Sequence, residues 1–235
     1  TTTLNKVNCL LAFDLVDPTL DVSILQPDGS VVEPGQPVMH IKGPAQSVVT
    51  AERTALNFIS HLSGIATVTA ELVAGVGNNK ARITCTRKTT PNLRALEKHA
   101  VRAGGGVSHR FGLDDGILIK DNHVALAGGI RPAIQSAKAG LGHMVKIEVE
   151  VDTLEQLDEA LSEGVDAILL DNMDPDLLRQ AVATIDGRAM SEASGRITAE
   201  QVPAIAASGV DIISAGWITH SAPALDLGLD FGVSA

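Results

Sequence analysis

The stretch VKIEVEVDTLEQLDEALSEGVDAILLDNM, residues 145–173, contains a strand–helix–strand unit on which the prediction of the fold rests. Apolar residues alternate with polar ones at 145–151, and an apolar run occupies 167–171, so both segments are predicted as strands. Between them, Thr153 and Gln156 form a capping box at the start of a helical pattern. Two strands joined by one helical crossover run parallel, so the stretch predicts an α/β fold.

The same alternation of strands and helices continues on both sides of this unit. Helical patterns that open with capping residues or close with glycine separate further apolar runs. Six or more such units favour a closed β/α barrel at 76–221, although an open doubly wound sheet has the same periodicity. The further predicted strands are 82–87, 117–120, 189–193 and 211–215.

Residues 1–75 have a different pattern, which predicts a separate and smaller domain. The segment 20–49 is rich in Val, Ile, Pro and Gly, as in short antiparallel strands joined by turns. A long helical pattern with an apolar face follows at 50–74. We therefore expect an N-terminal α/β domain at 1–75, with the tail 222–235 packed on it.

The composition excludes some classes of partner. A net charge of -10 and the scarcity of aromatic residues argue against nucleic-acid binding, which uses basic surfaces and stacking platforms. Residues 51–120 nevertheless hold ten Lys/Arg and only five Asp/Glu. Such a local excess of cations either gathers a small anion or forms a solvated helix face, and the count alone leaves both readings open.

The two cysteines, Cys9 and Cys85, have neither metal-binding nor redox spacing, and a disulfide framework is unusual in a chain of this size. No segment is expected to approach a transmembrane span, so no membrane partner is predicted. The expected location is therefore the cytoplasm.

Side chains at the carboxyl ends of barrel strands converge on one mouth. The early strand ends carry cations, and the middle ones carry carboxylates. Glu148 and Glu150 lie two apart on one strand and therefore share a face, which we expect to point into the barrel. Small residues after the late strands let backbone N–H groups approach a phosphate. The candidates are Arg87, Lys88, His109, Arg110, Lys120, Glu150, Asp171, Ser194, Gly195 and Gly216. Taken singly, Arg87 and Lys88 could also be surface charges, and Asp171 could cap a turn.

Four short motifs together resemble the quinolinate phosphoribosyltransferases. They are TRKT at 86–89, GGGVSHR at 104–110, IKDNH at 119–123 and EVEVD at 148–152. The resemblance extends over roughly residues 31–231 and keeps the order and spacing of the motifs, which makes it highly specific.

The resemblance implies a subunit in which an α/β sandwich adjoins an incomplete, seven-stranded β/α barrel. It also implies a homodimer in which one subunit donates Arg53 to the site of its partner. The chain before Glu52 is shorter than the N-terminal domain of the family, so a truncated sandwich is expected. The implied activity joins quinolinate to phosphoribosyl pyrophosphate and releases CO₂, giving nicotinate mononucleotide and pyrophosphate for NAD biosynthesis.

Site roles follow from the resemblance position by position. Lys88, Lys120, Glu150 and Asp171 are expected to be catalytic, with Glu150 and Asp171 near the ribose and holding Mg²⁺ directly or indirectly. Quinolinate is expected to contact Arg53, Arg87, His109, Arg110 and Lys120. The phosphates are expected to contact Ser194, Gly195, Gly216 and His220.

Two alternatives remain open on the sequence. One is a related phosphoribosyltransferase that acts on another acidic heterocycle, and the other is a descendant that binds ligands without catalysis. Arg196 and Trp217 also depart from the small residues common in the family, beside the presumed phosphate loops.

Overall fold

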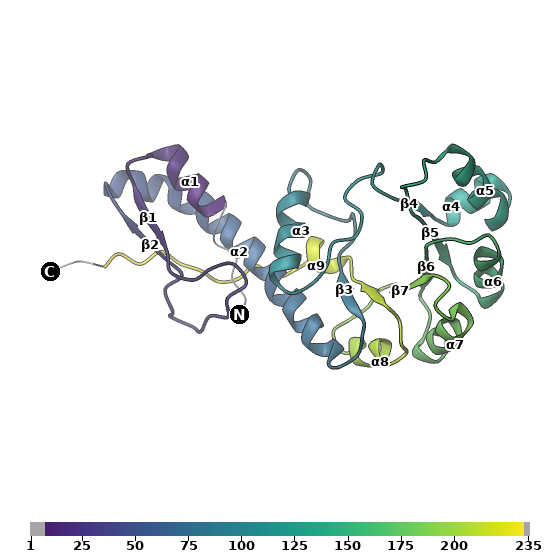
Figure 1. Ribbon diagram of the computed structural model, residues 1–235. Helices are drawn as coiled ribbons and strands as arrows, with labels where there is room; N and C mark the ends of the chain where they lie inside the picture. The colour runs from purple at the N-terminus through teal and green to yellow at the C-terminus, as the bar shows by residue number, and fades with distance from the viewer. Residues whose placement is uncertain (1–7, 233–235) are drawn as a thin grey trace. The chain divides into compact units, whose positions relative to one another are not determined.

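The structure is a computed structural model that describes residues 8–232. Its central feature is a six-stranded sheet in the order β3-β8-β7-β6-β5-β4, in which every pair of neighbours is parallel (Figure 1). This confirms the predicted α/β fold. The strands are β3 (Arg82–Thr84), β4 (Ile117–Ile119), β5 (Ile147–Val151), β6 (Ala167–Asp171), β7 (Met190–Ser194) and β8 (Ile212–Ser214).

The helices that connect the strands from β4 to β8 cover one face of this sheet (Figure 1). This follows because the crossovers are right-handed and the strands from β4 to β8 are added in one direction across the sheet. The apolar residues of β5 are buried and its two glutamates alternate with them. The strand therefore buries Ile147, Val149 and Val151 and turns Glu148 and Glu150 to the opposite face. The helices are α4 (Asp121–Ala127), α5 (Ile130–Gly140), α6 (Leu154–Ser162), α7 (Pro175–Ile185) and α8 (Val202–Ala206).

The same local capping pattern begins a helix at one place in the chain but not at another. The predicted capping box is present at α6, where Thr153 Oγ1 accepts a hydrogen bond from Gln156 N. Thr198 and Gln201 have the same spacing as this capping box but do not begin a helix. Gln201 Oε1 accepts from Thr198 N across a turn, and α8 begins only after Gln201. A local side-chain bond therefore forms in both places, but only one continues into a helix.

The sheet has six strands among the described residues, and this corrects the expected count of seven. The segment after the glycine run contributes one isolated bridge, between Thr84 and Val107, in which Val107 N donates to Ile83 O at 2.8 Å. A single bridge does not make a strand, because the following residues do not continue the ladder.

A smaller, antiparallel sheet forms in the N-terminal part of the chain, as predicted. Its strands β1 (Asp21–Ile24) and β2 (Met39–Lys42) pair in register from Asp21 with Lys42 to Ile24 with Met39. Cys9, Phe13 and Ile59 belong to the buried apolar cluster beside them. The helices of this part are α1 (Asn8–Val16) and α2 (Ala45–Val76), and the remaining helices of the chain are α3 (Arg94–Ala103) and α9 (Trp217–His220).

The C-terminal segment lies against α2. Leu225 N donates to Ser60 O at 2.9 Å. A Cβ atom at Gly64 would lie 2.1 Å from Pro223 O, so only glycine allows the two backbones to approach this closely.

The chain divides into two compact units. The first comprises Thr1–Ala70, Thr89–Gly106 and Trp217–Ala235, and the second comprises Glu71–Lys88 and Val107–Gly216. These units do not coincide with the predicted domains 1–75 and 76–221, because the first unit also takes in α3 and α9. Within the predicted domain and tail, residues 1–7 and 233–235 lie outside the described residues.

One helix of the described chain, α2, is long and apolar enough to cross a membrane by length and composition, with a mean hydropathy of 1.3. On these two criteria the expectation that no segment approaches a membrane span is wrong. However, 56% of the apolar window is buried inside the protein. Leu62, Ile65 and Leu72 are at most 1% exposed, as in the core helix of a globular protein.

Candidate active site

A cavity of about 300 Å³ in the second unit gathers most of the predicted cations. Most of its lining residues lie at or after the carboxyl ends of the parallel strands, as expected for a β/α fold, whereas Leu118, Leu169 and Glu192 lie within strands. Five different positions supply basic side chains, although the chain as a whole is acidic. The lining residues are Thr86, Arg87, Lys88, His109, Arg110, Leu118, Lys120, Leu169, Glu192, Ser194 and Ser214.

Two guanidinium groups in the cavity wall oppose each other electrostatically. Burial lowers the pKa of Arg110, and the positive charge of Arg87 lowers it further. Arg110 Nη1 donates to Gly116 O at 3.0 Å, which fixes one edge of its guanidinium. Two cations that disfavour each other in this way are stabilised by an anion with two negative groups.

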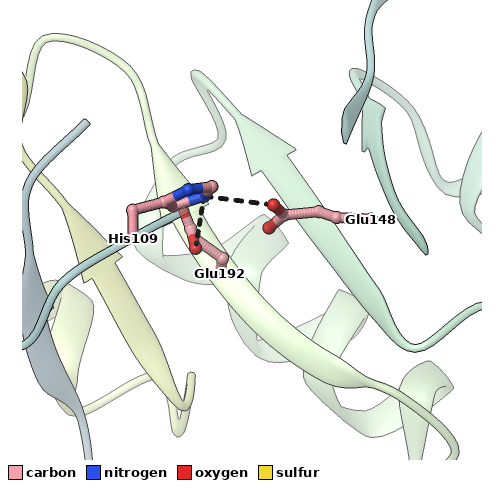
Figure 2. A group of neighbouring side chains, drawn as sticks. All are labelled: His109, Glu148 and Glu192. Carbon is pink, nitrogen blue, oxygen red and sulfur yellow. Dashed lines mark hydrogen bonds and ion pairs between the residues drawn. The ribbon is translucent and has the colours of Figure 1, made fainter. Parts of the chain in front are cut away.

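The imidazole of His109 lies between two carboxylates of the sheet (Figure 2). His109 Nε2 lies 3.1 Å from Glu148 Oε2 and 3.6 Å from Glu192 Oε2. Glu148 belongs to β5 and Glu192 to β7, and all three side chains are at least 87% buried. A histidine ring nitrogen thus contacts carboxylates that are 44 positions apart in the sequence.

Glu192 has an unusual environment for a carboxyl group. Its Oε1 atom is buried without a hydrogen-bond partner among the described residues. Burial, and secondarily the negative charge of Glu148, raises the pKa of Glu192 to about 8, while His109 and a hydrogen bond with Ser214 act in the opposite direction. These surroundings favour the protonated form of Glu192 over the charged form.

A second cation–carboxylate group lies at the mouth, where the strands end. Lys120 Nζ donates to Glu150 Oε2, and the lysine side chain is 46% exposed. Burial and the negative charge of Asp152 raise the pKa of Asp171, whereas Lys120 and Lys88 lower it. Glu150 is the last but one residue of β5 and Asp171 is the last residue of β6, so both lie near the carboxyl ends of neighbouring parallel strands.

The turn after β7 needs glycine. Gly195 has a φ of 102°, and a Cβ atom there would lie 2.3 Å from Asn172 Oδ1. Ser194 and Gly195 line a neighbouring cavity of about 320 Å³ together with Arg196, whose φ is also positive at 21°. The positive φ and the close approach of Asn172 together explain why glycine is required at this turn.

Two family profiles match consecutive parts of the chain. The one described as the N-terminal domain of quinolinate phosphoribosyl transferase matches residues 3–63, and its C-terminal domain matches residues 65–230. The chain belongs to the quinolinate phosphoribosyl transferase family.

Similar proteins agree with this family. The chain is 46% identical over 222 residues to a probable nicotinate-nucleotide pyrophosphorylase (carboxylating) of Bacillus subtilis, covering 94% of this chain and 77% of that protein. It is 48% identical over 206 residues to the nicotinate-nucleotide pyrophosphorylase (carboxylating) of Mycobacterium leprae, covering 86% and 72%. The crystal structure of NadC from Streptococcus pyogenes superimposes with a TM-score of 0.92 at 41% identity, covering 96% and 80%.

As a quinolinate phosphoribosyl transferase, the chain has most of its expected site residues in the second unit. Arg87, Lys88, His109, Arg110 and Lys120 line one cavity, together with Ser194. Glu150 joins this group through its ion pair with Lys120, and Asp171 through the charges of both lysines. Gly216 follows β8 at the end of the unit. The roles of these residues stay predictions.

Arg53 and His220 belong to the first unit. The side chain of Arg53 is 76% exposed on α2, with Glu52 3.9 Å away as its ion-pair neighbour. His220 ends α9 and its Nδ1 lies 2.7 Å from Ser221 Oγ. An exposed, weakly paired arginine is available for a contact outside its own unit, as the predicted donation to a partner requires.

The sequence pattern did not identify Glu192 as a site residue, although the structure places it in the cavity wall. The segment MSEAS was interpreted as a small-residue strand end. A glutamate in the middle of a strand that pairs on both sides is a usable signal, since a charge rarely faces a core without a function.

Two sets of side chains offer metal ligands. His109, Glu148 and Glu192 bring three ligand atoms within 4.8 Å of one another, and this is the one such group found among the described residues. The predicted Mg²⁺ residues, Glu150 and Asp171, are a different pair. Their oxygen ligands suit Mg²⁺, which is commonly bound by one or two carboxylates and by substrate phosphates.

Proposed function

We propose that the chain transfers a phosphoribosyl group from phosphoribosyl pyrophosphate to quinolinate, with release of CO₂ and pyrophosphate and formation of nicotinate mononucleotide. The observation that carries this proposal is the cavity in which Arg87, Lys88, His109, Arg110 and Lys120 converge. The names of the similar proteins support the same reaction, since both are pyrophosphorylases of the carboxylating type.

Quinolinate fits the cations of the cavity. It carries two adjacent carboxylates, and guanidinium groups bind carboxylates through two parallel hydrogen bonds. The mutual repulsion of Arg87 and Arg110 is relieved when a dianion binds between them. Binding energy of this kind holds the ring nitrogen in line with the ribose carbon that it attacks.

The carboxylates at the mouth fit the second substrate. The bond between the anomeric carbon and pyrophosphate breaks, and the ribose becomes cation-like. Glu150 and Asp171 would stabilise that positive charge or hold the ribose hydroxyls. The nitrogen–ribose bond then forms and leaves the ring nitrogen positive. The bond between the neighbouring ring carbon and its carboxylate then breaks, and CO₂ leaves. The electron pair of that bond stays on the ring carbon, where the adjacent positive nitrogen stabilises it, and a proton from water adds to the same carbon.

The proposal includes Mg²⁺ as a cofactor. Glu150 and Asp171 would hold it, directly or through the substrate, and it would neutralise the charge of the pyrophosphate group. The ion pair of Glu150 with Lys120 favours an indirect role for Glu150, because the ammonium already occupies one of its oxygens.

We further propose a homodimer in which Arg53 completes the site of the partner subunit. The exposure of Arg53 supports this arrangement. The proposed place of action is the cytoplasm.

The test is to mix the purified protein with quinolinate, phosphoribosyl pyrophosphate and Mg²⁺ and to measure nicotinate mononucleotide and CO₂ together. We expect equal amounts of both products, no product after chelation of Mg²⁺, and loss of activity by at least about 100-fold in Arg87→Ala. Arg179→Ala is the matched control, because Arg179 pairs with Asp176 on the surface of α7 and is outside the cavity. Turnover of nicotinate in place of quinolinate would contradict the proposal.

A further inference from the structure

The segment between the isolated bridge at Val107 and β4 carries Arg110, one of the two guanidinium groups of the cation cavity. Residues 108–116 belong to no helix or strand of the described chain. Phe111 and Leu113 are 51% and 69% exposed, so these apolar side chains do not anchor the segment in the core. Other contacts must therefore hold Arg110 at the cavity wall.

The carboxylate of Asp115 binds the two peptide groups that directly follow Arg110. Phe111 N donates to Asp115 Oδ2, and Gly112 N donates to Asp115 Oδ1 at 2.9 Å. The first of these N–H groups belongs to the peptide unit that Arg110 shares with Phe111. Hydrogen bonds to an ionised acceptor are roughly twice as strong as those between neutral groups, so one side chain closes the loop on itself.

The other anchors of Arg110 come from the same loop. Arg110 N donates to His109 Nδ1 at 2.8 Å, and Arg110 Nη1 donates to Gly116 O at 3.0 Å. Gly116 directly follows Asp115 in the sequence. Asp115 therefore fixes the backbone just after Arg110 and directly precedes the carbonyl group that orients the guanidinium.

The sheet fixes the end of the loop at which Asp115 lies. Ile117 N donates to Lys146 O at 3.0 Å, and β4 pairs with β5 from Ile117 onward. Asp115 is two residues before this strand, and it lines a cavity of about 310 Å³ together with Arg110. Its carboxylate thus connects the position of Arg110 to the position of the sheet.

We propose that Asp115 is a positioning residue that holds the guanidinium group of Arg110 for the carboxylates of the substrate. The identity of that substrate rests on the proposed function. Among the described residues, those that line the cation cavity do not include Asp115, so it acts through Arg110. By its charge alone, a carboxylate near an anion-binding arginine weakens anion binding, so the benefit of Asp115 lies in the geometry that it imposes.

The first arm of the test separates geometry from charge by steady-state kinetics. Asp115→Asn removes the negative charge and places an amide NH₂ group opposite one of the two backbone donors. If geometry decides, the KM for quinolinate should rise about tenfold at pH 7, while kcat and the KM for phosphoribosyl pyrophosphate change less than about twofold. If charge alone decides, the variant should bind the dianion more tightly and its KM should fall.

Asp114→Asn is the matched control. It removes the same charge from the neighbouring position of the same loop, and the exposed carboxylate of Asp114 makes no hydrogen bond or ion pair within the described residues. The KM for quinolinate of this variant should stay within about twofold of that of the unchanged protein, because an exposed charge contributes little.

The second arm needs no turnover. Titration calorimetry with quinolinate alone should give a Kd about tenfold higher for Asp115→Asn than for the unchanged protein and for Asp114→Asn. The NMR signal of the Arg110 Nε–H group, identified by its absence in Arg110→Lys, should show a more mobile side chain in Asp115→Asn. Urea unfolding should change little in both variants, because the loop is exposed.

Three results would overturn the proposal. They are an unchanged or lowered KM for quinolinate in Asp115→Asn, an equal rise of this KM in Asp114→Asn, and an equal rise of the KM values for both substrates in Asp115→Asn. The last result would indicate a general disturbance of the site. If the unchanged protein neither bound nor turned over quinolinate, the proposed function would fail, whereas the NMR measurement would still decide whether Asp115 holds Arg110.

Discussion

Each of the two units contains a buried glutamate in contact with a histidine, and the pKa values of the two carboxyl groups are shifted in opposite directions. In the first unit, Glu97 of α3 has a fully buried side chain, and its Oε1 lies 2.9 Å from His61 Nε2. Its other oxygen accepts from Thr90 N at 2.9 Å. Burial alone would raise the pKa of Glu97, but the hydrogen bonds from His61 and Thr90 outweigh it and lower the pKa.

Glu192 in the second unit lacks these partners and has a second carboxylate beside it instead, so its pKa is raised. Burial is therefore not what decides the charge of a carboxyl group, because both groups are buried. The charge of such a carboxyl group is set by the number of hydrogen-bond donors that reach its two oxygens and by the sign of the nearest charge. The hydrogen bonds of Glu97 favour its charged form, whereas the surroundings of Glu192 favour its protonated form.

The largest expected effect is on the pH dependence of stability. The pKa of Glu192 is raised from 4.5 in the unfolded chain to about 8, so its stabilising contribution is complete below pH 4.5 and is lost as the pH rises through about 8. One proton corresponds to about 1.4 kcal/mol per pH unit, or roughly 4 kcal/mol from pH 5 to pH 8. Urea unfolding of the unchanged protein and of Glu192→Gln should show this difference; parallel curves would contradict it.

Glu97 should contribute to the free energy of unfolding with the opposite pH dependence. The lowered pKa of Glu97 means that its contribution is present above pH 4.5 and is lost as the pH falls below that value. Glu97→Gln places an amide NH₂ group, which is a hydrogen-bond donor, opposite the donors of His61 and Thr90. It should lower the free energy of unfolding by about 1–3 kcal/mol at pH 7. Glu192→Gln should not destabilise the protein at pH 8. Equal losses in both variants, measured by urea unfolding, would show that burial alone controls these groups.

The smallest effect is expected for Thr90→Val, which sharpens the comparison. This change removes the hydroxyl that hydrogen-bonds to Glu97 and keeps the backbone N–H that donates to it. We expect a loss of about 0.5–1.5 kcal/mol and an upward shift of the Glu97 pKa, detected by carboxyl NMR titration. An unchanged titration would mean that the backbone bond and His61 suffice.

Much of the fold follows from sequence because each strand has a strong pattern. The run AILLD forms β6 with the predicted bounds of 167–171, because four consecutive apolar residues suit a strand in the interior of a parallel sheet. Glycine and proline signals predicted the ends of the helices less accurately. Pro91, a residue type that is common in the first turn of a helix, instead lies in a turn, and α3 begins only at Arg94. The bond from Thr90 N to Glu97 holds the chain in a turn there, and no local rule describes a contact across seven residues.

The site was predictable where the chemistry lies at strand ends. Arg87 and Lys120 follow β3 and β4, and the parallel sheet brings them to one cavity. The family resemblance added residue roles that periodicity does not contain. Glu192 was missed because its neighbours Ser191 and Ala193 are small, and because His109 and Glu148, which define its environment, are distant in the sequence. Glu148 and Glu192 come together because β5 and β7 both pair with β6, and His109 reaches them from the segment that follows the bridge at Val107.

The contact between Gly64 and the C-terminal segment has a consequence for synthesis on the ribosome. The second unit is nearly continuous in the chain, so it can begin to fold as soon as its strands emerge. The first unit is assembled from three separated segments, and Ser60 receives its hydrogen bond from Leu225. Its N-terminal apolar residues are synthesised first, but their contacts with the segment around Leu225 can form only after that segment has also been synthesised. Nascent chains of this protein are therefore exposed longest at their N-terminal part, which is where a chaperone would be needed.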